Sequence, residues 1–472
     1  MKIDGTVGVE IVMAEETTQV LAQFAAALKY EDIPDGVREH SKNLLLDALA
    51  CALAGHQGEE THQVAAFAAA LAQSDESSVI GGDHLSLAGA TLLNGFLITA
   101  VTMCDAHRST MAHITPEVVP PALAIAERDG LSGRDLLVAI AAGCEVTTRI
   151  GIGLDYPAFR ARGFHAPGVL GPFGAAAAVG RLRGFDSETM AKAFGLAGSQ
   201  AAGTFAAWGT PTVKFHQCRG ALSGLMAALL AEQKFLATRE FLTAKDGGLY
   251  NAYSNGGKPE LATADLGRRW ELEQIALRLW PSASLMQGMN TALFDLLQRH
   301  DIDAAQTKQV RVALAKTAFD MHGNIPRYKG KFDALISGHY TAAVILHDRT
   351  LTLAQFAPAR YDDPKLRRFA EERVDIRLDP ALNGAEAVVE IETAGGATLQ
   401  ARCDHAKGAP ENPLAREEIE GKLRAYAVDR LPASRIEEVI AAVNRLEDLG
   451  DVRELMDMLR HGPLRTRGER AA

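Results

Sequence analysis

Apolar residues recur with helical spacing through most of the chain. From about residue 15 to about residue 265, and again after Gly408, apolar positions lie three and four residues apart, which is the period of an α-helix. Several of these stretches are apolar on more than one side, as expected for helices buried inside a large domain. One predicted helix follows Pro34 and ends at Gly55.

Two helix starts carry local signals. Thr115 followed by Pro116 predicts an N-cap residue with proline at the first helical position. Ser132, three residues before Asp135, predicts a capping box in which aspartate takes the place of the more common glutamate.

The spacing changes between about residues 268 and 408. Alternating apolar and polar residues from Gln309 and from Arg373 predict two half-buried strands, and a third alternating stretch predicts a hairpin that turns at Gly395 and Gly396. Helical stretches lie between these strands. The sequence therefore predicts a mainly α protein. A large all-helical domain is formed by both chain ends, residues 1–267 and 409–472, and a smaller α+β lid domain is inserted at 268–408.

Composition narrows the class of protein. The chain has 472 residues with 47% hydrophobic and 23% charged residues, which is typical of a globular protein with a sizeable core. Its net charge of −10 gives no reason to expect a nucleic-acid or membrane-surface partner. No stretch approaches the roughly 18 uninterrupted apolar residues of a membrane span. The first 16 residues lack the apolar centre of a signal peptide, so we expect a cytoplasmic protein.

The cysteines agree with a reducing compartment. There are five of them, an odd number, and no two have the spacing of a metal-binding pair. We therefore expect neither a disulfide framework nor a zinc or iron–sulfur site. The five positions are Cys51, Cys104, Cys144, Cys218 and Cys403.

Three side chains stand out because they occur among small residues. His113, His165 and Lys214 each lie in or beside a helical stretch rich in alanine and glycine. Small residues let helices approach closely, so a long cationic or imidazole side chain there is expected to project into a pocket between helices. This pattern favours an enzyme that handles a carboxylate without a metal.

Longer stretches of the chain resemble the MmgE/PrpD family, which includes 2-methylcitrate dehydratase, cis-aconitate decarboxylase and iminodisuccinate epimerase. The similar stretches run nearly from end to end and include KNLLLDALACALAG, LLNGFLITAVTMCDAH, GFHAPGVLGPFGAAAAVGRLRGF, TVKFHQCRGALSGLMAALLAE and VNRLEDLGDVREL. The resemblance implies a helical domain built from both chain ends, an inserted lid and a homodimer.

The resemblance also assigns site residues one by one. The histidines and the lysine named above match family positions, as does Asp105, whereas Thr102 and Ala106 replace a family aspartate and threonine. The implied catalytic residues are His113, His165, Lys214 and Asp105, and the implied substrate-binding residues are Arg278, His322 and His107.

Reactions of this family break a bond at a carbon next to a carboxylate. Cations that neutralise the carboxylate lower that barrier, and Lys214 and Arg278 can do so, the arginine with bidentate geometry. Histidines can take up and return a proton near neutral pH. The chemistry needs no cofactor. We expect four side chains to converge on one cavity between the helical body and the inserted domain, namely those of His113, His165, Lys214 and Arg278.

The resemblance leaves several activities open for a small anionic carboxylate substrate. Dehydration of a 2-methylcitrate-like hydroxy acid is placed first, followed by epimerisation of an imino- or amino-dicarboxylate. Decarboxylation of cis-aconitate is placed behind these because Arg278 and His322 differ from the family lysine and tyrosine. A non-catalytic, carboxylate-binding dimer is the alternative from another class. A metal pair of His107 and His113, six positions apart, is not favoured, because that spacing aligns poorly on a helix or a strand.

Overall fold

The computed structural model describes residues 17–460, which form two compact units. The first unit contains the residues up to Ala100, Cys104–Ile275 and the residues from Ile419 onward, and the second contains Val101–Met103 and Ala276–Glu418. The boundaries that the sequence predicts lie at 267/268 and 408/409, and they stay a prediction. The N-terminal segment considered for a signal peptide lies outside the described residues.

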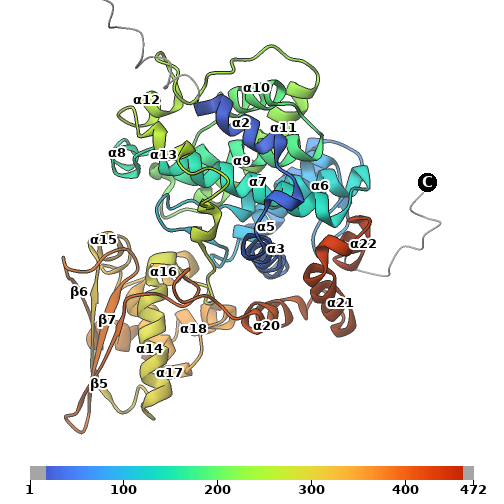
Figure 1. Ribbon diagram of the computed structural model, residues 1–472. Coiled ribbons are helices and arrows are strands. Elements are labelled where there is room, and N and C mark those ends of the chain that lie inside the picture. The colour runs from blue at the N-terminus through green and yellow to red at the C-terminus, as the bar shows by residue number, and fades with distance from the viewer. Residues whose placement is uncertain (1–16, 461–472) are drawn as a thin grey trace, which may run out of the picture. The chain divides into compact units, whose positions relative to one another are not determined.

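Helices make up most of the first unit (Figure 1). Their bounds are α2 Thr17–Ala27, α3 Asp35–Gly55, α4 Thr61–Leu71, α5 Leu87–Thr99, α6 Thr115–Asp129, α7 Gly133–Ile152, α8 Tyr156–Ala161, α9 Ala166–Leu182, α10 Ser187–Gly198, α11 Thr212–Glu232, α12 Leu249–Tyr253, α13 Pro259–Thr263, α20 Arg416–Ala427, α21 Ala433–Asn444 and α22 Arg453–Met458.

Small residues let the central helices of this unit approach closely. Helix α9 packs against both α7 and α11, and every residue in its first fifteen positions is buried. A Cβ atom placed on Gly174 of α9 would lie only 1.8 Å from the hydroxyl oxygen of Thr147 on α7. Glycine is therefore required at this contact, and the two helix backbones pack directly against each other.

The first and the last of the described residues belong to this unit. The C-terminal helices α21 and α22 pack against α3 and α6, which are formed about 300 or more residues earlier, as the red and blue-to-cyan ribbons of Figure 1 show. Among the described residues, no helix is both long and apolar enough to cross a membrane.

Local signals predicted some helix ends and missed another. Helix α3 runs from Asp35 to Gly55, and Ser132 and Asp135 form the predicted capping box of α7. The prediction that Thr115 is an N-cap residue is wrong. Thr115 is the first helical residue of α6, and its hydroxyl donates to the carboxylate of Asp105 instead of accepting from the next turn.

The second unit is built on a four-stranded mixed sheet. The strand order is β6-β5-β7-β8, with β6 parallel to β5 and the other neighbours antiparallel. The two predicted strands and the predicted hairpin are confirmed, and Gly396 in the hairpin turn has a φ of +86°, which favours glycine. The strands are β5 Thr307–Leu314, β6 Val374–Leu378, β7 Ala387–Thr393 and β8 Thr398–Cys403.

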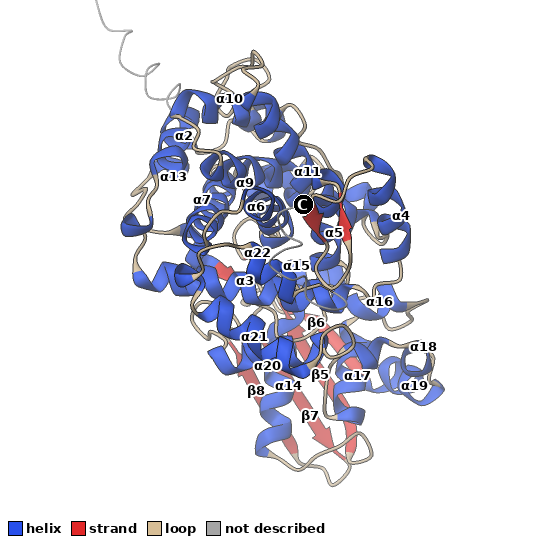
Figure 2. Ribbon diagram, turned by 90° about the vertical axis from the view of Figure 1, so that its right-hand side faces the viewer, coloured by secondary structure: helices blue, strands red, loops and turns tan. Residues whose placement is uncertain are grey.

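Helices of the second unit cover one face of this sheet. Helix α14 packs on β7 and β8, and α17 packs on α14 and β6 (Figure 2). The helices of this unit are α14 Gln287–Arg299, α15 Lys316–His322, α16 Lys331–Ile336, α17 Gly338–Asp348, α18 Pro358–Tyr361 and α19 Pro364–Arg373.

The predicted fold class, mainly α with an all-helical large domain, is wrong. The first unit also contains short strands, and together with the four-stranded sheet they make the fold a mixture of α and β. A two-residue strand is too short to show an alternating pattern, so these strands could not be predicted from the sequence. These strands are β1 Ser77–Ser78, β2 His84–Leu85, β3 Ala106–His107 and β4 Ile275–Ala276, the last where the chain leaves this unit.

Candidate active site

His113 lies just before α6, and its hydrogen bond fixes which ring nitrogen carries a hydrogen. Its Nδ1 atom lies 2.7 Å from the backbone oxygen of Asp105. A carbonyl oxygen can only accept, so Nδ1 donates and the lone pair of the neutral ring is on Nε2. His113 therefore exchanges a proton with other groups through Nε2.

Asp105 holds this region in place through its carboxylate. One oxygen accepts from the backbone N–H of Ile114 at 2.7 Å, and the other accepts from the N–H of Thr115 at 3.0 Å and from the Thr115 hydroxyl. Burial raises the pKa of Asp105, and the bonds from Thr115 and Ile114 oppose that rise. The Asp105 carboxylate thus caps the start of α6, although it lies ten residues before Thr115 in the chain. The backbone oxygen of Asp105 orients the ring of His113.

His165 forms a pair with a second histidine. It is the residue directly before α9, and its Nδ1 lies 3.0 Å from Nδ1 of His216 on α11. One of these nitrogens must donate and the other accept, so the pair does not hold two charged rings in this arrangement. The sequence predicts His165 as a catalytic residue but not His216. His216 lies two residues after Lys214 on α11, and its contact with His165 could not be predicted because the two histidines lie 51 residues apart.

The surroundings of His165 keep its ring neutral. Burial, then the nearby His216, His113 and Arg160, lower the pKa of His165 to about 3. The electrostatic effect of His113 on His165 places these two predicted catalytic histidines in one region of the first unit. A neutral imidazole there can accept a proton or share a hydrogen bond, but it is not a cation at neutral pH.

Lys214 projects from the first turn of α11 and is buried. Its Nζ donates to the backbone oxygen of Ala100 at 2.7 Å and lies 3.5 Å from a carboxylate oxygen of Glu60. Residues two apart on a helix point to roughly opposite sides, so Lys214 and His216 serve different surroundings. The structure therefore groups the histidines with one another and gives Lys214 partners of its own.

His107 is held by structural contacts. It is fully buried on β3, with Nδ1 2.9 Å from the hydroxyl of Thr110 and Nε2 3.4 Å from a carboxylate oxygen of Glu271. The nearby ring of His107 is the main cause of the lowered pKa of Glu271. Its predicted role in substrate binding stays a prediction.

Arg278 and His322 belong to the second unit. Arg278 is buried and donates to the backbone oxygen of Ser282 at 3.1 Å. His322 is buried at the end of α15, with Nδ1 2.9 Å from the backbone oxygen of Ile336, and burial lowers its pKa to about 4. That these residues bind the substrate also stays a prediction.

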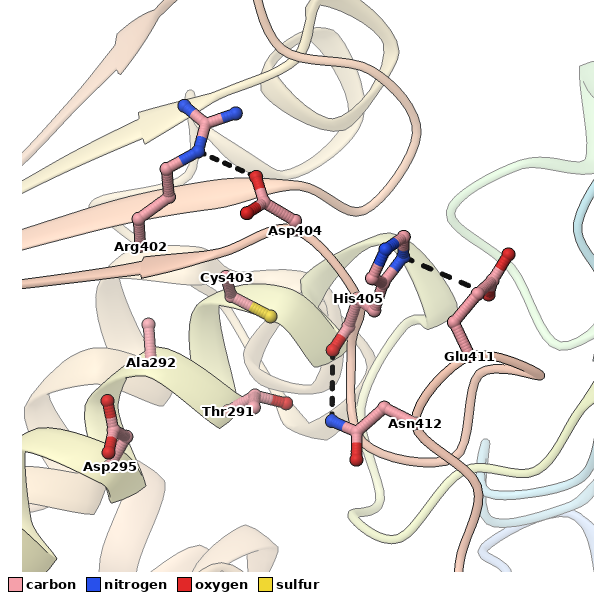
Figure 3. A pocket seen from close by; sticks show the side chains of 9 residues that line it. All are labelled: Thr291, Ala292, Asp295, Arg402, Cys403, Asp404, His405, Glu411 and Asn412. Atoms are coloured by element: carbon pink, nitrogen blue, oxygen red, sulfur yellow. Dashed lines mark hydrogen bonds and ion pairs between the residues drawn. The ribbon is translucent and has the colours of Figure 1, made fainter.

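The second unit has an open pocket of about 350 Å³ between α14 and the end of β8 (Figure 3). Its charged side chains face one another. Nε of Arg402 lies 2.6 Å from Asp404, and the ring of His405 lies 3.9 Å from Glu411. No predicted site residue lines this pocket, and its arginine is already paired with a carboxylate. We therefore place the candidate site in the first unit.

Within the part of the chain that the structure describes, no group of three or more His, Cys, Asp or Glu side chains is arranged to hold a metal ion. The five cysteines are buried, and none of them forms a disulfide.

Models of one protein family match residues in both units of the chain. The MmgE/PrpD N-terminal domain matches residues 19–262, and the MmgE/PrpD C-terminal domain matches residues 280–448. The chain belongs to the MmgE/PrpD family. The family resemblance inferred from sequence stretches is thereby confirmed.

Relatives within the MmgE/PrpD family align along nearly their whole length. The cis-aconitate decarboxylase-like protein oryM of Aspergillus oryzae is 29% identical, covering 94% of this chain and 97% of the relative. A cis-aconitate decarboxylase of Aspergillus terreus is 26% identical, with 94% and 95% covered. The cis-aconitate decarboxylase of Homo sapiens is also 26% identical, with 96% of both chains covered. These relatives support a lyase-type enzyme of this family.

Proposed function

We propose that this protein is a lyase that decarboxylates a small unsaturated tricarboxylate of the cis-aconitate kind. The sequence alone favours dehydration of a 2-methylcitrate-like acid over decarboxylation. The relatives at 26–29% identity support decarboxylation instead, because they align over nearly the full chain and are named for that reaction.

The observation that carries the proposal is that His113 and His165 differ in how they can transfer a proton. His113 keeps Nδ1 on the Asp105 backbone oxygen, so its Nε2 can take up and release a proton, whereas His165 is neutral at pH 7. Decarboxylation needs a proton donor at carbon, and we assign that role to the charged form of His113. We assign His165 to accepting hydrogen bonds or protons.

The reaction can be written with these groups. The bond between one carboxylate carbon and the skeleton breaks, carbon dioxide leaves, and the electron pair spreads into the remaining unsaturated acid. Nε2 of His113 then delivers a proton to carbon and regains one from water. Lys214 supplies a positive charge that stabilises the developing negative charge on a remaining carboxylate.

The test is product analysis in D₂O with cis-aconitate, 2-methylcitrate and an imino-dicarboxylate as separate substrates. We expect carbon dioxide from cis-aconitate and one deuterium on carbon for each molecule released. Loss of water without carbon dioxide would support dehydration instead, and deuterium exchange without net change would support epimerisation. No turnover of any substrate would favour the non-catalytic alternative.

Variants connect that activity to the site. His113→Asn keeps a donor to the Asp105 backbone oxygen but removes the titrating ring, so we expect kcat to fall about 10²- to 10⁴-fold. Lys214→Ala should also lower turnover by orders of magnitude. His62→Asn, on an exposed position of α4, is the control and should retain activity. Full activity of His113→Asn would remove this histidine from the mechanism.

A further inference from the structure

Arg160 is a half-buried cation with no anionic partner among the described residues. It lies on α8, and among residues 17–460 no carboxylate lies within 4.0 Å of its guanidinium. Acidic residues outnumber lysine and arginine in this chain by 59 to 49. Arg149 and Arg128 of the first unit have such partners in Glu145 and Asp129, whereas the half-buried Arg181 and Arg219 donate to backbone oxygens. An unpaired arginine in this setting is therefore a candidate to bind an anion that is not part of the chain.

An aromatic ring holds this cation next to the histidine pair. The guanidinium carbon of Arg160 lies 3.5 Å from the ring centroid of Phe205. The ring of His165 meets the same Phe205 ring at 5.3 Å between centroids and at an angle of 84°. Stacking on an aromatic face orients a guanidinium and leaves its N–H groups directed sideways. Phe205 thus fixes the arginine and His165 on one side of the first unit.

Two further features make this region favourable for a negative charge. His165 directly precedes α9, a helix of 17 residues, whose positive end lies there. In the His165–His216 pair one Nδ1 donates to the other across 3.0 Å, so the accepting ring carries its hydrogen on Nε2 and can donate it to an anion. The pair adds no negative charge. The fields of Arg160, of the helix end and of the ring donors have the same sign.

We propose that Arg160, with His165 and His216, binds one carboxylate of the substrate that does not react. This proposal rests on the proposed function, in which the substrate has three carboxylates. Arginine can hold a carboxylate with two parallel hydrogen bonds, and the neutral histidines can add one more. Lys214 points to the opposite side of α11 from His216, so it is not part of this subsite. The cluster would then select acids with several carboxylates over monoacids.

Kinetics of three variants test the assignment. Arg160→Gln removes the charge, and losing a charge-assisted hydrogen bond should raise KM for cis-aconitate about 10- to 100-fold with kcat changed little. Arg160→Lys keeps the charge without the bidentate geometry, so its KM should lie between the values of the wild type and of Arg160→Gln. Arg162→Gln makes the same change two residues away on an exposed side chain and should leave KM unaltered. An equal rise in KM for Arg160→Gln and Arg162→Gln, or no rise for either variant, would overturn the proposal.

A second readout separates recognition from a merely structural role. The wild type should process each isomeric monoester of the substrate poorly, whereas Arg160→Gln should process at least one monoester as well as the triacid. A structural role would lower activity toward every compound by the same factor. Thermal unfolding of the variants identifies any that fail to fold.

Binding without turnover keeps this inference distinct from the proposed function. Tricarballylate, the saturated triacid, can be titrated calorimetrically into wild-type protein and into the variants. We expect Arg160→Gln to weaken its Kd at least 10-fold. If the wild type turns over no substrate but this dependence on Arg160 is observed, the function fails and the subsite stands. An unchanged Kd in Arg160→Gln rejects the subsite even if decarboxylation is found.

Discussion

Glu117 is a carboxylic acid buried in the centre of the first unit with no hydrogen-bond partner among the described residues. It lies on α6, and both of its oxygens lack a partner there. A Cβ atom on Gly171 of α9 would lie 2.2 Å from its carboxyl carbon, so glycine at that position leaves the room that the acid occupies. Burial, and then the charge of Asp105, raise its pKa well above the ordinary 4.5. Glu117 is therefore neutral in the folded protein over a wide range of pH.

This protonation state makes stability depend on pH in a definite direction. Between the ordinary pKa of about 4.5 and the raised one, the folded protein holds a proton that the unfolded chain has released. The free energy of unfolding therefore falls as pH rises through that window, by about 1.4 kcal/mol for each unit of pH. Glu117→Gln has no such proton, so its stability relative to wild type should increase as pH rises above about 4.5.

Denaturant unfolding at several pH values between 4.5 and 8 measures this difference. The same series with Glu59→Gln, a change at an exposed glutamate of the same unit, is the control and should show no trend. A difference between Glu117→Gln and wild type that stays constant with pH would mean that the folded protein carries Glu117 as a carboxylate.

At the scale of elements, a buried ion pair on α7 anchors the segment that follows α13. Nε of Arg149 donates to Glu145 at 2.5 Å, and its guanidinium also donates to the backbone oxygens of Ala264, at 2.5 Å, and Arg269. Glu145 in turn accepts from the backbone N–H of Leu272 at 2.8 Å. One pair of side chains thus satisfies backbone groups along a stretch that would otherwise be buried without partners.

Breaking this pair should be costly, because the remaining charge stays buried. We expect Arg149→Met to lower the free energy of unfolding by about 3–5 kcal/mol, and the double variant Glu145→Leu/Arg149→Met to recover part of that loss. Lys192→Met removes a pair of the same helical spacing with Glu188 at a more exposed position, and it should cost less than about 1 kcal/mol. Similar losses for Arg149→Met and Lys192→Met would show that burial does not decide the effect.

At the scale of the whole molecule, a second buried pair joins the two ends of the chain. Nζ of Lys422 on α20 lies 2.6 Å from a carboxylate oxygen of Asp47 on α3, with at most 1% of either side chain exposed. Burial alone would lower the pKa of Lys422, but Asp47 and then Cys51 outweigh it, and the pKa is raised. The lysine is therefore charged, and the pair holds the returning C-terminal helices on the first unit.

Lys422→Met should loosen this closure without disturbing the sheet of the second unit. In hydrogen exchange, we expect faster exchange in α20 and in the second half of α3, and unchanged protection in β5 and β7. Arg424→Met, on the same helix in an exposed pair with Glu437, is the matched control and should leave α3 unaffected. Unchanged exchange in α3 after Lys422→Met would show that other contacts suffice to hold the chain ends together.

Features that depend on residues close together in the chain could be predicted from the sequence. The helix α3, the capping box of α7 and the strands β5, β6 and β7 follow from spacing, since burial of one side imposes a period on each element. The family also followed from sequence, because several stretches kept both their order and their residues. His113 and His165 stood out because imidazoles are uncommon among small residues. The homodimer implied by the resemblance stays a prediction.

Only the tertiary structure decided which of these side chains act on one another. The hydrogen bond between Asp105 and the start of α6, the contact of His165 with His216 and the stacking of Arg160 on Phe205 join residues from different elements. No local pattern encodes such contacts, because they depend on how close-packed helices place distant parts of the chain. The sequence by itself determined the elements, the family and a set of candidate groups. The fold decided their partners, their charges and therefore their chemistry, since burial and proximity exist only after packing.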